Sequence, residues 1–102
     1  MKFVISTQTL ENYGSHTEDG RFASGNAYWK YKGGTDYVVS GLDRIQDAVA
    51  YVAALCIQNS IDYKEFPVDM QTYAEWEAKM GELSEDYRDF ILETAKFVNP
   101  AD

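Results

Sequence analysis

The first nine residues alternate between the two sides of an extended chain. Phe3, Ile5 and Thr7 fall on one side, and the residues between them fall on the other. Alternation with many β-branched residues is typical of a strand, so we expect one from Met1 to Thr9. The next segment, Leu10 to Asn26, is rich in Gly, Asn, Ser, Asp and Glu. This composition predicts a long loop, and loops of that length in compact domains are often functional.

Two β-rich runs follow, from Ala27 to Lys32 and from Thr35 to Ser40, separated by Gly33 and Gly34. A glycine pair supplies the positive φ angles of a two-residue turn, so this pattern predicts a β-hairpin in which Lys32 pairs with Thr35. The register divides the side chains between two faces. One face carries Trp29, Tyr31, Asp36 and Val38. The other carries Tyr28, Lys30, Lys32, Thr35, Tyr37 and Val39.

From Leu42 to Asn59 the apolar residues follow a helical period, with a stripe at Ile45, Val49, Val52 and Cys56. Asp43 with Gln46 three residues later predicts a capping box at the start of this helix.

The segment Ile61 to Pro67 is interpreted as a linker with room for a short strand at Tyr63 to Phe66. Two further helices are predicted. The first runs from Met70 to Met80 with Asp69 as its cap, and the second runs from Glu85 to Val98 with Ser84 as its cap. One stripe of the last helix holds Tyr87, Phe90, Ile91, Thr94, Phe97 and Val98.

Strands that precede helices predict an α+β fold, in which a small, N-terminal, antiparallel three-stranded sheet is packed on one face by about three C-terminal helices. A length of 102 residues supports one hydrophobic core, so we expect a single domain over residues 1–102. No stretch reaches the roughly 20 apolar residues that a membrane helix needs, and the apolar run at the start is too short for a signal peptide. The single cysteine, Cys56, excludes an intrachain disulfide and favours a reducing cytosol.

The net charge of −8 is concentrated near the C-terminus. Residues 1–64 carry seven acids and six bases, whereas residues 65–102 carry ten acids and three bases, a net charge of −7. Such a field repels nucleic acids and anionic membranes and attracts basic protein surfaces. The candidate acidic partner surface comprises Glu75, Glu77, Glu82, Glu85, Asp86, Asp89 and Glu93.

Two interpretations of these acids stay open. They can form an ordinary solvated face, or they can mimic DNA, because acids one helical turn apart are spaced about 5–6 Å, close to the spacing of phosphates along a strand. A calcium site is not expected, because the chain has no glycine-centred calcium loop.

A second candidate surface is the aromatic, lysine-bearing hairpin with a nearby arginine. It comprises Tyr28, Trp29, Lys30, Tyr31, Lys32, Tyr37 and Arg21. Rings on which bases stack, next to cations that meet phosphate, are typical of nucleotide binding, while the same residues also suit ordinary sheet packing.

Signatures of catalysis are missing. The sequence has no Gly-x-Ser-x-Gly motif, phosphate loop, dinucleotide-binding glycine pattern or paired-histidine zinc motif. The lone histidine, His16, needs partners from elsewhere for any chemistry, and Cys56 on the helical apolar stripe is expected to pack in the core with a protonated thiol. We therefore expect no enzyme, no cofactor and no metal site.

The first 40 residues carry two pieces in a fixed order. These are Glu-Asn-Tyr-Gly at residues 11–14 and Trp-Lys-x-Lys-Gly-Gly at residues 29–34. In these pieces the chain resembles a group of small proteins of tailed bacteriophages whose function is mostly unassigned. The resemblance implies expression in the bacterial cytoplasm, and it carries over no catalytic residue.

These observations give a leading hypothesis and an alternative. The leading hypothesis is a phage accessory protein that binds and inhibits a host defence or nucleic-acid-handling protein through its acidic helices. The alternative is a sponge that sequesters a small nucleotide signal at the aromatic hairpin. An open, aromatic sheet face also predicts a homodimer that associates through the sheet.

Overall fold

The computed structural model describes residues 1–12, 29–56 and 62–100, and within them it confirms the α+β class. The elements are β1 (Lys2–Asn12), β2 (Trp29–Gly33), β3 (Asp36–Ser40), α1 (Ile45–Leu55), β4 (Tyr63–Thr72), α2 (Tyr73–Met80), α3 (Glu85–Thr94) and β5 (Lys96–Val98). The long-loop prediction fails for Leu10 to Asn12, which belong to β1, and its remaining residues lie outside the described parts.

The sheet is mixed and larger than expected. Strand β1 lies in its centre and pairs with β4 on one side along most of its length. On its other side β1 pairs first with β3 and then with β2, all antiparallel. Strand β5 pairs with β3 in parallel at the opposite edge. The predicted antiparallel three-stranded sheet is therefore replaced by a mixed sheet of five strands in the described residues.

The predicted hairpin at Gly33 and Gly34 is wrong. Both β2 and β3 pair with β1, so the glycine pair continues one long extended segment instead of reversing it. Gly33 has a φ of 127°, and Gly34 lies so close to β1 that a side chain there would collide with the carbonyl oxygen of Thr7. Because glycine permits positive φ in bulges as well as in turns, the same sequence signal fits both structures.

A one-residue bulge at Lys32 decides which side chains share a face. Thr9 pairs with Gly33, but the next residue, Leu10, pairs with Tyr31, so Lys32 is the extra residue. The shift turns Tyr31 to the face that Asp36 also occupies. The predicted grouping of these two residues is therefore confirmed, although a bulge and not a turn causes it.

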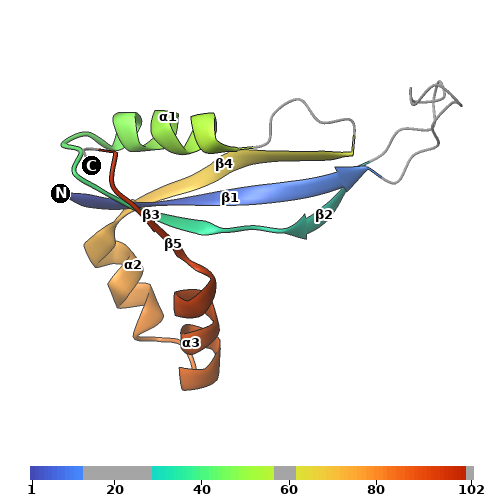
Figure 1. The fold of residues 1–102 in the computed structure, drawn as a ribbon. Helices are drawn as coiled ribbons and strands as arrows, with labels where there is room; N and C mark the ends of the chain where they lie inside the picture. Colours follow the sequence, from blue (N-terminus) through green and yellow to red (C-terminus); the bar gives the residue numbers. More distant parts are fainter. Residues whose placement is uncertain (13–28, 57–61, 101–102) are drawn as a thin grey trace, which may run out of the picture.

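Helices cover both faces of the sheet, which corrects the expectation of one covered face (Figure 1). Helix α1 packs on the face that carries Phe3, Ile5, Tyr37 and Val39. Helices α2 and α3 lie on the other face, where Val4 and Val38 meet the α2 residues Trp76 and Met80. The strands are apolar on both sides at this end of the sheet, so each face needs its own cover. No helix in the described parts of the chain is long and apolar enough to cross a membrane.

The start of α1 differs from the prediction. Its N-cap is Arg44, which makes no capping hydrogen bond through its side chain, so the box expected from Asp43 and Gln46 does not form. The helix is fixed instead by burial of Ala48 and Val52. Tertiary packing thus replaces the local cap.

The region before α2 was predicted as a linker with room for a short strand at Tyr63 to Phe66 and as the start of a helix at Met70, and only the short strand is confirmed. It is the ten-residue strand β4, in which Pro67 is tolerated because β4 pairs only with β1 in the described sheet. Helix α2 begins at Tyr73 and not at Met70, and its capping box is formed by Thr72 and Glu75 instead of a cap by Asp69.

Helix α3 begins as predicted. The side chain of Ser84 accepts a hydrogen bond from the backbone amide of Tyr87. The helix ends at Thr94, earlier than expected, because Lys96 to Val98 pair with β3 as strand β5.

Substitution of Gly34 tests the close approach to β1. We expect Gly34→Ala to lower the free energy of unfolding by about 1–3 kcal/mol, because the new methyl group meets fixed backbone at Thr7. The measurement is urea unfolding followed by circular dichroism. Gly81→Ala is the control, since a methyl group there makes only ordinary contacts and should change stability by about 1 kcal/mol or less. Equal stability of the two variants would contradict the inference.

Candidate functional site

A cleft lies between the glycine-containing segment that joins β2 to β3 and the facing side of α3. Its volume is about 560 Å³. The sheet side is formed by residues from β1 and by the stretch from Tyr31 to Asp36, and the helix side is formed by Tyr87, Phe90, Ile91 and Thr94. We call this space the α3 cleft. Its volume lies within the range of about 300–1,000 Å³ that is usual for small-molecule sites.

The polar part of the α3 cleft is centred on Asp36. Ser6 donates a hydrogen bond from its hydroxyl to Asp36 Oδ1 at 2.6 Å, and the Trp76 indole donates to Oδ2 at 3.1 Å. Both donors are neutral, and among the described residues no cation pairs with this carboxylate. Asp36 therefore brings a fixed negative charge to the cleft.

Aromatic rings dominate the walls. Tyr31 is 68% exposed, Tyr87 is 55% exposed and Phe90 is 59% exposed. Helix α3 contains no buried residue, so its aromatic stripe is only partly used for packing against the sheet. Three large rings that share one open cleft are typical of a binding surface.

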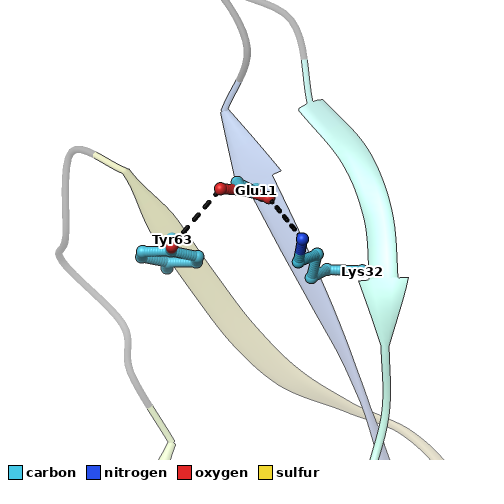
Figure 2. Close-up of polar contacts among 3 residues, drawn as sticks. All are labelled: Glu11, Lys32 and Tyr63. Carbon is cyan, nitrogen blue, oxygen red and sulfur yellow. Dashed lines mark hydrogen bonds and ion pairs between the residues drawn. The ribbon is translucent and has the colours of Figure 1, made fainter.

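The ammonium group of Lys32 lies away from this cleft. It forms an ion pair with Glu11 at 3.1 Å, and the Tyr63 hydroxyl donates to the same carboxylate at 3.3 Å (Figure 2). Glu11 and Tyr63 are paired residues of β1 and β4. Thr7 donates a hydrogen bond to Glu65 on the α1 face of the sheet. Because side chains two residues apart in a strand share a face, Glu11 lies on this α1 face as well, together with its two partners. Lys32 is thus one of the residues that line the cleft, while its ammonium group pairs with Glu11 on the opposite face.

The α1 face holds a second polar group of side chains around Glu65. Thr7 donates to Glu65 Oε2 at 2.8 Å and the Tyr37 hydroxyl donates to the same atom at 3.5 Å. Burial, the charge of Glu65 and a hydrogen bond to it raise the pKa of the Cys56 thiol to about 11. The expectation that Cys56 packs in the core is confirmed, since it is buried and unpaired.

The predicted aromatic surface is divided by the structure. Tyr37 is buried beneath α1, whereas Tyr31 is exposed in the α3 cleft. The ring of Trp29 lies under the ammonium group of Lys64 at 4.4 Å. Lys30 is exposed and pairs with Glu11 in the register of β1 and β2. Arg21, Tyr28 and His16 lie outside the described residues.

The predicted acidic surface is exposed throughout. Each of its seven acids, on α2, α3 and the turn between them, is solvent-exposed. Residues 73–94 contain these seven acids and only two bases, a net charge of −5. The described residues contain no group of three or more ligating side chains that could hold a metal ion.

Sequence reasoning missed Asp36 and Ser6 as residues of a cleft. Nothing in their local pattern marks them, because α3 meets the sheet only through tertiary packing. Phe90 and Tyr87 were assigned to an apolar stripe, and that stripe is the signal that could have indicated the cleft.

The chain was compared with protein-family models, with curated proteins and with solved structures, and none of them matches it.

The side chains around Glu65 on the α1 face, including Tyr37 and Cys56, predict that the protein loses stability at high pH. The pKa of Cys56 rises from 9.0 to about 11, and burial with the charges of Glu65 and Cys56 raises the pKa of Tyr37 from 10.0 to about 12. Above about pH 9 the unfolded chain loses these protons before the folded protein does, so the free energy of unfolding falls until both groups have titrated.

Urea unfolding at a series of pH values between 8 and 12 measures this effect, with pH chosen to span the two pKa values. Cys56→Ala combined with Tyr37→Phe should flatten the decline. Glu65→Gln should make the decline smaller and end it at a lower pH, because the folded pKa values of Cys56 and Tyr37 then lie closer to those of the unfolded chain. A wild-type profile as flat as that of the double variant would contradict the prediction.

Proposed function

We propose that this chain is a binding protein that docks onto a basic surface of a partner protein through α2 and α3. The observation that carries the proposal is the exposure of all seven acids within a segment of net charge −5. A surface of one sign attracts a surface of the other and accelerates association. No catalytic step is part of the proposal.

The resemblance to bacteriophage proteins supplies the setting of this proposal. In that setting the partner is a host defence protein or a protein that handles nucleic acid, and the chain inhibits it by occupying its nucleic-acid surface. The spacing of acids along α3 supports such mimicry, since Asp86, Asp89 and Glu93 lie three and four residues apart.

A sponge for a small nucleotide is the second candidate. The volume and the aromatic walls of the α3 cleft favour it. The charges favour it less, because the Lys32 ammonium meets Glu11 on the other face and the Asp36 carboxylate would repel a phosphate. Thermal shift against a panel of cyclic and linear nucleotides tests it, since a ligand at 100 times its dissociation constant stabilises a protein by roughly 2.7 kcal/mol.

The main proposal predicts binding that depends on salt and on α3. The partner is first captured from bacterial lysate and identified by mass spectrometry. Its association rate constant should fall steeply between 0.1 and 1 M salt, because the Debye length shrinks from about 10 Å to about 3 Å.

A matched pair of charge variants locates the surface. Asp89→Asn with Glu93→Gln should lower the association rate constant several-fold, whereas Asp43→Asn with Asp47→Asn, exposed acids before and within α1, should leave it near the wild-type value. An association rate that is equal for both double variants and insensitive to salt would refute the electrostatic proposal.

Self-association through the sheet stays a prediction. The prediction assumed one open, aromatic face of the sheet, but helices cover both faces. Tyr31, Phe66 and other rings nevertheless remain exposed and can contact a second copy of the chain. Light scattering should report about twice the chain mass of 11.6 kDa, and Trp29→Glu should return the protein to a monomer. A wild-type monomer at high concentration would contradict it.

A further inference from the structure

The α3 cleft combines two features that suit one kind of ligand. Its walls carry the exposed rings of Tyr31, Tyr87 and Phe90, and Asp36 supplies a carboxylate. Aromatic faces attract cations, and a carboxylate attracts them more strongly where water is partly excluded. Both features therefore select a positively charged group.

The carboxylate of Asp36 has acceptor capacity to spare. Each of its oxygens accepts one hydrogen bond from a neutral donor, Ser6 or Trp76. An ionised carboxylate offers about four lone-pair sites, so both oxygens can accept a further bond. The two donors hold the carboxylate in place without neutralising its charge.

The surroundings reinforce this selectivity. Glu93 and Asp89 are exposed on the same helix as the aromatic walls, while the Lys32 ammonium is held by Glu11 on the opposite face of the sheet. An anionic ligand would meet Asp36 without a facing cation from Lys32. A cationic ligand would be attracted by Asp36 inside the cleft and by the exposed acids of α3 outside it.

We propose that the α3 cleft binds the guanidinium group of an arginine side chain that a basic partner segment presents. A guanidinium is planar, stacks on aromatic rings and forms two parallel hydrogen bonds with a carboxylate. Lysine carries a compact, strongly hydrated charge and lacks this geometry. The inference rests on the proposed function, because the arginine belongs to the basic surface that the acidic helices attract.

The test uses the full chain and three short peptides that differ at one position, which is arginine, lysine or citrulline. Citrulline keeps the shape of arginine without its charge. The reporter is the indole N–H resonance of Trp76, which donates to Asp36 and is one of two such resonances in the chain. The arginine peptide should shift this resonance in a saturable way, with the other two peptides at least about tenfold weaker, as expected for loss of a charge-assisted bond.

Variants of α3 separate the cleft from the rest of the helix. Phe90→Ala removes a wall residue that is 59% exposed, and it should weaken binding of the arginine peptide several-fold. Leu92→Ala removes a 44% exposed residue of the same helix that does not line the cleft, and it should bind as the wild type does. Asp36→Asn should also weaken binding, and unchanged far-ultraviolet circular dichroism shows that each variant is folded.

The outcomes for the cleft and for the acidic surface are distinguishable. Equal binding of arginine and citrulline peptides, or a Trp76 shift caused by a nucleotide and not by the arginine peptide, would overturn the inference. So would a captured partner that loses affinity with Asp89→Asn and Glu93→Gln but not with Phe90→Ala; in that case the acidic-surface proposal would stand alone. Selective arginine binding that Phe90→Ala weakens several-fold supports the cleft even where no partner is captured.

Discussion

The bulge at Lys32, next to the positive φ of Gly33, is the constraint on which the candidate site depends. One extra residue in β2 reverses the faces of every side chain that precedes it, because strand side chains alternate. Without the bulge, the side chain of Tyr31 would lie on the α1 face of the sheet, and the side chain of Lys32 would lie on the face that α3 covers. With it, the ring of Tyr31 joins Asp36 in the cleft, and Lys32 meets Glu11 on the opposite face.

Gly34 gives the same segment its close contact with β1. The Thr7 amide donates to the Thr35 carbonyl at 2.9 Å, and the Thr35 amide donates to the Thr7 hydroxyl at 3.2 Å. These bonds continue the pairing where β2 and β3 are interrupted. The absence of a side chain at Gly34 permits that approach.

The two faces of the sheet consequently have different chemistry. On the α1 face Glu65 is bonded by Thr7 and Tyr37, and the neighbouring Cys56 is buried with a raised pKa, so this side is occupied by its own residues. On the other face α3 packs through Ile91 while Tyr87 and Phe90 stay more than half exposed. A ten-residue helix is marginal by itself, and burial of those rings by a ligand or partner would add to its stability.

What the sequence determined by itself was local or compositional. Alternation at Phe3, Ile5 and Thr7 predicted β1, the stripe through Val49 and Val52 predicted α1, and Ser84 predicted the start of α3, because each of these signals acts between residues close in the chain. The exposure of the acids followed from charge, since a carboxylate without a partner stays in water. Tertiary structure decided the rest. Strand β4 was predicted only in its first residues, Tyr63 to Phe66, because its pairing partner, β1, lies about sixty residues earlier. The glycine pair was read as a turn because only the partner strand distinguishes a turn from a bulge. Asp36, Ser6 and Trp76 come together solely because β1, β3 and α2 pack on one another, and that packing depends on long-range burial that no local pattern encodes.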